Sequence, residues 1–171
     1  MSKKFLITGC QRSGTRFYAK RLAEQHGVSY IDENVYGVRD YEALKEILRG
    51  KSGFCVHGPA IKGHVQEFKA DYPDAEIIWM FRDTEETIKS MVKKGWRWSA
   101  YNEWIAMAPL LSALGLMETY WCNLYWLIRD MSKALGERYC EMGIVDRVVN
   151  MSTLEGLEGF KKTSHGNPGT D

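Results

Sequence analysis

The fold is decided by residues 4–15, which read KFLITGCQRSGT. The apolar run at residues 4–8 predicts a buried strand, and the glycines after it predict a turn. Residues 14–26 mix apolar and basic side chains and stop at Gly27, which predicts an amphipathic helix. In a strand, loop and helix of this kind, backbone N–H groups and the positive end of the helix converge on an anion.

Strands and helices alternate along the rest of the chain. Apolar runs predict further strands at residues 28–31, 53–57, 76–81 and 138–144. Amphipathic segments predict helices at residues 40–48, 61–70 and 84–94, within residues 96–135, and from Ser152 onward. We therefore expect an α/β fold, a three-layer sandwich around a mostly parallel central sheet.

Composition limits the possible classes of protein. The 171 residues suit one core, so we assign residues 1–162 to a single domain and residues 163–171 to a tail that is flexible or ordered by ligand. The net charge of +1 argues against a nucleic-acid binder, and the four cysteines lack metal-ligand spacing. The apolar runs are too short or too interrupted for a membrane span. We expect a cytoplasmic protein with reduced thiols and no metal.

The loop has the spacing of a Walker A phosphate loop but not its chemistry. Gly9 and Gly14 match G-x-x-x-x-G, whereas Thr15 and Arg16 stand where an ATP-hydrolysing loop carries Lys and a magnesium-binding hydroxyl. The positive charge lies inside the loop instead, at Arg12. This pattern predicts phosphate binding without magnesium. The alternative is a glycine turn that only links the strand to the helix.

Arg82 and Ser90 form a second candidate anion site. Arg82 follows the strand predicted at residues 76–81, at the sheet edge where α/β proteins bind ligands. Ser90 lies about two turns into the next predicted helix. A guanidinium fork and a hydroxyl both suit a phosphate. The alternative is an ion pair between Arg82 and Asp83 at the helix start, with Ser90 on the surface.

His57 is the candidate general base. It ends an apolar run and precedes Pro59, and a histidine at the carboxyl edge of a strand can take a proton near neutral pH. A structural histidine is the alternative, and His64 is a rival for the role. The aromatic side chains of residues 96–126 are either helical core or the walls of a pocket for phenols, sugars or apolar alcohols.

Taken in chain order, the three motifs resemble those of sulfotransferases that use 3′-phosphoadenylyl sulfate (PAPS). Residues 11–15, QRSGT, are similar to the family's 5′-phosphosulfate loop, and Arg82 with Ser90 is similar to its 3′-phosphate motif. By this resemblance His57 is the base and Arg12 contacts both the leaving phosphate and the sulfuryl group. The residues implied to bind PAPS are Gln11, Arg12, Ser13, Gly14, Thr15, Arg16, Arg82 and Ser90.

The resemblance covers residues 5–90 and departs from the family at three positions. Arg16 replaces a common hydroxyl residue, Cys55 replaces a common lysine, and Thr84 replaces a common proline. In the C-terminal part, Lys161, Lys162 and Ser164 are only loosely similar to a basic segment that closes over the 3′-phosphate.

The resemblance implies a P-loop NTPase-like fold and metal-independent transfer of a sulfuryl group from PAPS to a hydroxyl or amine. The acceptor is a small molecule, sugar or phenol-like compound, and adenosine 3′,5′-bisphosphate (PAP) is the second product. Two alternatives stay open. One is a non-catalytic module that binds PAP or PAPS, and the other is a small P-loop nucleotide or adenylylsulfate kinase.

Overall fold

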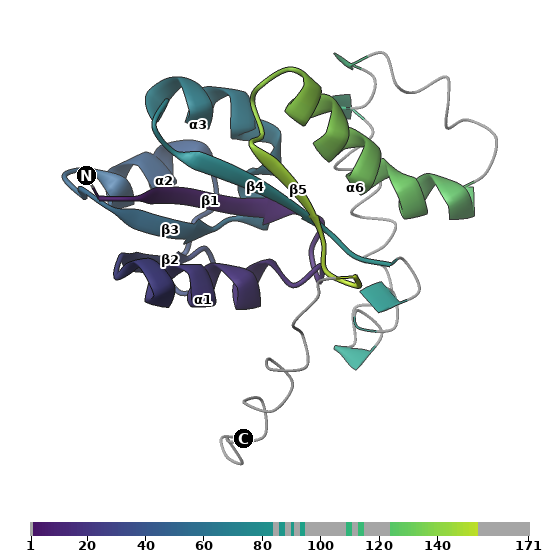
Figure 1. Cartoon of the computed structure of the whole chain (residues 1–171), viewed down its shortest axis with the longest axis horizontal. Helices are drawn as coiled ribbons and strands as arrows, with labels where there is room; N and C mark the ends of the chain where they lie inside the picture. Colours follow the sequence, from purple (N-terminus) through teal and green to yellow (C-terminus); the bar gives the residue numbers. More distant parts are fainter. Residues whose placement is uncertain are drawn as a thin grey trace.

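Figure 1 shows a computed structural model of the chain. The structure describes residues 2–83, 86–87, 90, 93–94, 109–110, 113–114 and 124–153, and of residues 124–131 only the helical backbone. Most of the aromatic segment, the basic segment at residues 161–164 and the tail at residues 163–171 lie outside the described residues. The same holds for the helix predicted from Ser152, beyond Thr153.

The described strands form one parallel sheet with the order β2-β3-β1-β4-β5. Their bounds are β1 Lys4–Gly9, β2 Ser29–Asp32, β3 Phe54–His57, β4 Glu76–Phe81 and β5 Arg147–Asn150. From β1 the chain passes to one side for β2 and β3, and then to the other side for β4 and β5. The carboxyl end of β1 is therefore a topological switch point, where open α/β sheets bind ligands.

Helices cover both faces of this sheet. One face carries α1 (Thr15–His26), and the other carries α2 (Tyr41–Leu48), α3 (Val65–Asp71) and α6 (Leu124–Glu141), as Figure 1 shows. A 3₁₀ helix, η1 (Pro59–His64), leads from β3 into α3. The predicted α/β sandwich of three layers is confirmed, and the described sheet is parallel throughout.

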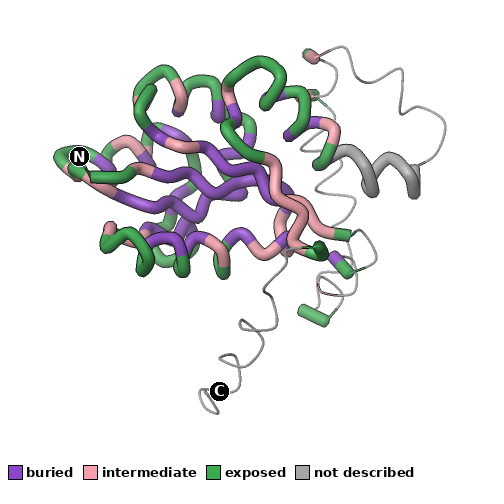
Figure 2. Tube along the Cα trace, in the orientation of Figure 1, coloured by how far each residue is buried: buried purple, intermediate pink, exposed green. Residues whose placement is uncertain are grey.

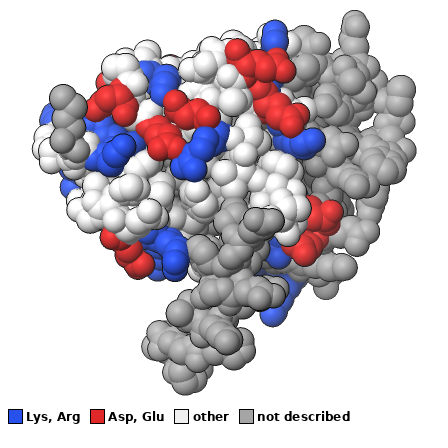
Figure 3. Space-filling model, in the orientation of Figure 1, with Lys and Arg blue, Asp and Glu red and all other residues white. Residues whose placement is uncertain are grey.

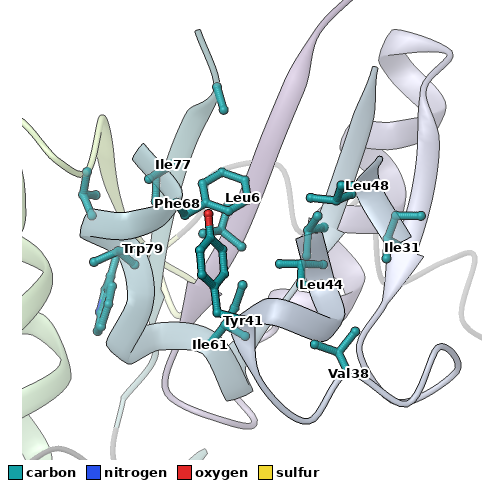
Figure 4. Packing of buried hydrophobic residues seen from close by; sticks show 14 of the residues in the cluster. Leu6, Ile31, Val38, Tyr41, Leu44, Leu48, Ile61, Phe68, Ile77 and Trp79 are labelled. Carbon is teal, nitrogen blue, oxygen red and sulfur yellow. The ribbon is translucent and has the colours of Figure 1, made fainter. Parts of the chain in front are cut away.

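Alternating side chains of the central strands build two cores. Phe5 and Ile7 of β1 pack toward α1, together with Leu22 and other buried side chains. Leu6, between them, packs on the opposite face with Tyr41 and Phe68 (Figure 4). Because both faces are covered, the central strands β1, β3 and β4 are buried along most of their length, as the purple trace in Figure 2 shows.

Local sequence signals place most element boundaries correctly. The structure has β4 at the residues predicted for it, and α1 ends at Gly27, whose φ of 60° is readily adopted by glycine. The helix predicted at residues 61–70 begins earlier, as η1, and then continues as α3. In the helix predicted at residues 84–94, the described Glu86, Thr87, Ser90 and Lys93 are helical.

The strand predicted at residues 138–144 is wrong. Helix α6 continues to Glu141, the chain then turns at Gly143, and the last strand is β5. Leu135 and Tyr139, which are one helical turn apart, are both buried, and the Tyr139 ring lies 5.7 Å from that of Trp79. Burial of one helical face therefore determines the conformation of this apolar stretch.

The described surface agrees with the nearly balanced composition. On the face shown in Figure 3, the described Lys and Arg side chains lie among Asp and Glu side chains. Described charged side chains also form ion pairs, such as Lys4 with Asp74 and Lys69 with Asp146. Within the described ranges, no helix is both long and apolar enough to cross a bilayer.

Candidate functional site

A cavity of about 640 Å³ lies at the carboxyl ends of β1–β4. Eight of the nine predicted site residues line it: Gln11, Arg12, Gly14, Thr15, Arg16, His57, Arg82 and Ser90. Six further described residues, which the sequence analysis did not assign to the site, also line it: Phe17, Lys20, Glu33, Asn34, Pro59 and Lys94. The three predicted motifs therefore share one cavity.

The loop between β1 and α1 depends on left-handed backbone conformations. Gly9, Arg12 and Gly14 have φ values of 121°, 65° and 86°. A Cβ at Gly9 would lie 2.1 Å from the Met80 carbonyl oxygen, so β4 leaves no room for a side chain there. Arg12 is the one described non-glycine residue with positive φ, a conformation that costs an L-residue about 1–2 kcal/mol.

Ser13 is the predicted site residue that does not line the cavity. Its hydroxyl is fully buried and donates to the carbonyl oxygens of Cys10, at 2.5 Å, and Met80, at 3.2 Å. The backbone N–H of Ser13 also donates to Cys10, at 3.3 Å. Ser13 therefore fastens the loop to β4, and its side chain gives no support to the predicted phosphate contact.

Arg12 and Ser90 bring the two anion motifs together. The Arg12 Nε and Nη2 atoms donate to Ser90 Oγ at 3.0 and 2.9 Å, although the residues are far apart in sequence. Arg82 lines the same cavity and pairs with Glu86, with 2.6 Å between Nε and Oε2. Lys94, four residues after Ser90, adds another cation to this end of the cavity.

Arg16 is paired with a carboxylate. Its Nε lies 2.8 Å from Asp32 Oδ2, and its Nη2 donates to Asp32 Oδ1 at 3.2 Å. Asp32 also accepts from the Tyr30 hydroxyl at 2.8 Å and from the Asn34 backbone N–H at 3.0 Å. Burial favours the protonated acid, but the hydrogen bonds from Tyr30, Arg16 and Asn34 outweigh it and hold the pKa of Asp32 below its usual range.

His57 lies between Thr15 and Asp32. Its Nε2 is 3.1 Å from Thr15 Oγ1, and its Nδ1 is 3.6 Å from Asp32 Oδ1, with no hydrogen-bond partner on Nδ1. Only 5% of the residue is exposed. Burial lowers the pKa of His57 to about 4, the charge of Arg16 acts in the same direction, and Asp32 opposes the shift. The imidazole is therefore neutral at pH 7.

The rival histidine lies elsewhere. His64 is exposed, sits 3.4 Å from Glu67 Oε1, and stacks on the Tyr41 ring with 5.7 Å between ring centroids. It does not line the cavity. Of the two predicted candidates for the base, His57 is the one that the fold places at the cavity.

Cys55 faces α1 rather than the cavity. Its Sγ lies 3.3 Å from the Ala19 carbonyl oxygen, and burial raises the pKa of the thiol to about 12. A thiol in this environment is an inert part of the core. Among the described residues, the lysines that line the cavity are Lys20, in α1, and Lys94, in a turn, so neither ammonium group comes from the position of Cys55.

The end of β2 contributes acidic and polar groups that sequence reasoning missed. Asp32, Glu33 and Asn34 follow one another there, and the buried Glu33 accepts from the Ala60 backbone N–H at 2.6 Å. The predicted strand stops at residue 31, and the sequence analysis assigns these three residues no role. A usable signal was available, because side chains at the carboxyl ends of parallel strands meet at one edge.

The comparisons with known proteins identify no family for this chain, so a functional assignment depends on the geometry of the site. No protein-family model matches the chain, and a search of curated proteins finds no match.

Proposed function

We propose that this protein is a PAPS-dependent sulfotransferase on a P-loop NTPase-like fold. It transfers a sulfuryl group to a hydroxyl or amine of a small acceptor. The observation that carries the proposal is the pair of hydrogen bonds from Arg12 to Ser90, because it joins the two phosphate motifs at one cavity. A glycine turn without function has no need of a second cationic motif beside it.

The strand order suggests how the nucleotide lies. The loop after β1 takes the 5′-phosphate, and Arg82, Ser90 and Lys94 beyond β4 take the 3′-phosphate. The group attached to the 5′-phosphate then points to the opposite side, over the ends of β3 and β2. His57, Glu33 and Asn34 line that side of the cavity, together with Phe17 and Pro59. The acceptor binds there.

The reaction is an in-line transfer. A lone pair of the acceptor oxygen or nitrogen forms the new bond to sulfur, and the bond from sulfur to the bridging phosphate oxygen breaks. That electron pair stays on the phosphate, so PAP leaves as an anion. The acceptor's proton goes to Nε2 of the neutral His57. Arg12 and the loop N–H groups stabilise the charge that grows on the leaving phosphate.

The kinase alternative fits this loop poorly. The first hydroxyl of α1, that of Thr15, is bonded to His57, and the next position carries the cationic Arg16 in place of a magnesium-binding hydroxyl. A cation at this position repels a divalent ion. Transfer of a sulfuryl group, which carries less charge than a phosphoryl group, is compatible with arginine and backbone donors.

The experiment combines calorimetry with a turnover assay on the full chain. Titration with PAP, AMP and Mg·ATP is expected to show the tightest binding for PAP. Incubation with ³⁵S-labelled PAPS and a panel of phenols, sugars and amines is expected to give a labelled product and PAP. Equal affinity for PAP and AMP refutes the proposal, and tight PAP binding without turnover on any acceptor favours the non-catalytic module.

Three variants test the roles of the cavity residues. Arg12→Ala is expected to lower turnover about 10²–10³-fold, and His57→Ala about 10²–10⁴-fold. Glu33→Gln tests the buried carboxylate of the cavity as an alternative base. A larger loss of turnover in Glu33→Gln than in His57→Ala would assign the role of base to Glu33. His64→Ala is the matched control, because this histidine is exposed and lies away from the cavity.

A further inference from the structure

Each ring nitrogen of His57 faces a side chain from a different element. Thr15, the first residue of α1, lies against Nε2, and Asp32, the last residue of β2, faces Nδ1. The ring is almost fully buried, and Nδ1 has no partner within hydrogen-bond distance, so the Asp32 carboxylate at 3.6 Å is the charged group that it faces. The orientation and the protonated nitrogen of the ring are therefore determined by these two side chains.

The geometry selects one tautomer. Asp32 is ionised and can only accept, so the nitrogen facing it is the one that carries the proton. Nε2 then holds the lone pair, and the hydrogen bond across 3.1 Å runs from the Thr15 hydroxyl to Nε2. Asp32 itself is held in place by Tyr30, Arg16 and Asn34, which belong to two elements and a turn.

The Thr15 hydroxyl has a single proton, and it lies at the point where an anion would bind. Thr15 lines the cavity directly after Gly14, whose positive φ shapes the loop. A phosphate oxygen in the loop is a stronger acceptor than a neutral imidazole. An anion there competes with His57 for the Thr15 proton.

We infer that Asp32 and Thr15 are positioning residues for His57. Asp32 fixes the tautomer that carries the proton on Nδ1, and Thr15 covers Nε2 until a phosphate in the loop takes the Thr15 hydroxyl. Binding of the sulfuryl donor then uncovers the lone pair that receives the acceptor's proton. The inference rests on the proposed function for its catalytic meaning, whereas the coupling between anion and imidazole is testable without turnover.

Other charges act on the same ring and set the direction of the expected response. Asp32 favours the imidazolium, and Arg16 of α1 disfavours it. Glu33 at the end of β2 and the cavity cations Lys20, Arg12 and Arg82 share the cavity with His57. An added phosphate brings negative charge and removes a hydrogen bond to the neutral form, and both changes raise the pKa of His57.

The test is nuclear magnetic resonance of the full chain with ¹⁵N-labelled histidine. Replacing each of the four histidines in turn by Gln assigns the signals. In the free protein at pH 7, His57 is expected to show a protonated Nδ1 and an unprotonated, hydrogen-bonded Nε2. Inorganic phosphate or PAP should move the Nε2 signal toward that of an unbonded nitrogen and raise the His57 pKa by about one unit.

Substitutions at Thr15 and Asp32 distinguish positioning of the His57 ring from general effects on the fold. Thr15→Val should reproduce the Nε2 signal of the phosphate-bound wild type already in the free protein, and Thr15→Ser should restore the wild-type response. Asp32→Asn should remove the preference for Nδ1–H. Asp71→Asn is the matched control, because Asp71 also accepts a tyrosine hydroxyl at 2.8 Å, from Tyr41, and lies on the far face of the sheet from α1.

The outcomes distinguish this inference from the proposed function. A proton on Nε2 in the free wild type, or an unchanged Nε2 signal after calorimetry has shown that PAP binds, overturns the inference and leaves the sulfotransferase proposal standing. If inorganic phosphate shifts Nε2 as expected but PAP binds no better than AMP, the coupling holds and the sulfotransferase proposal fails.

Discussion

The two ends of the cavity hold their charged groups in different ways. At the β2 and β3 end, Asp32 is saturated by Tyr30, Arg16 and Asn34, and it has only 4% of its side chain exposed. At the β4 end, Arg12 donates to the neutral Ser90 hydroxyl. There Arg82 pairs with Glu86, whose side chain is 48% exposed.

This difference indicates that the two ends of the cavity have different roles. Protein groups hold one another in place at the β2 and β3 end, so the proposed base is fixed before any ligand arrives. Hydrogen bonds to a neutral hydroxyl and to an exposed carboxylate are easily exchanged for bonds to a phosphate dianion. The β4 end is therefore the part of the site that we expect to rearrange when a nucleotide binds.

The largest expected effect concerns pH and the preformed end. The pKa of His57 is about 4 in the folded chain, against 6.5 for an ordinary histidine. Between these values the unfolded chain binds more protons than the folded chain, so the free energy of unfolding falls as the pH is lowered from about 6.5 to about 4. The total loss from this residue is about 3 kcal/mol.

Urea unfolding at a series of pH values measures this loss. His57→Gln should flatten the dependence in that window, and His64→Gln should leave it as in the wild type. If both variants keep the wild-type slope, His57 is not held neutral by burial, and the end of β3 is more open than the structure indicates.

The second effect concerns the β4 end. Arg82→Ala should weaken binding of PAP about 30-fold, or about 2 kcal/mol, and should leave binding of AMP almost unchanged, because only PAP has a 3′-phosphate. Calorimetry with the two nucleotides gives the ratio of affinities. Arg39→Ala serves as the control, since this exposed arginine does not line the cavity. An equal loss of affinity for both nucleotides would indicate that Arg82 contacts the 5′-phosphate instead of the 3′-phosphate.

The smallest effect separates Arg16 from the phosphate-binding residues. Because Arg16 is half exposed and engaged with Asp32, Arg16→Gln should lower stability by about 0.5–1 kcal/mol and change PAP affinity less than about threefold. Thermal unfolding and calorimetry on one preparation measure both quantities. A tenfold loss of affinity would show that Arg16 leaves Asp32 for the phosphate, as the family resemblance implies.

Local sequence patterns were sufficient for much of the fold. The apolar run of β4 and the glycine that ends α1 are local signals; β4 has the predicted bounds, and α1 ends at the predicted residue. The predicted strand at residues 138–144 failed because an apolar stretch of that length suits a strand or a helix equally. Contact of Tyr139 with Trp79, a residue distant in sequence, decides between them.

The candidate site was predicted in its parts but not in its internal contacts. The glycine spacing, Arg82 and His57 stand out in the sequence, and the predicted site residues other than Ser13 line the cavity. The pairing of Arg16 with Asp32 and the contact of Thr15 with His57 join residues from different elements. Contacts of this kind depend on the order of the strands, which a single sequence does not state.

The left-handed backbone at Arg12 has an evolutionary consequence. Glycine would relax the strain at this position and make the loop more stable, but only a long cationic side chain can reach Ser90 and a bound phosphate. Selection for heat resistance and selection for ligand affinity therefore favour different residues here. If the proposed function holds, homologues that have lost phosphate binding should drift toward glycine at position 12, whereas those that bind should keep an arginine or lysine despite the strain.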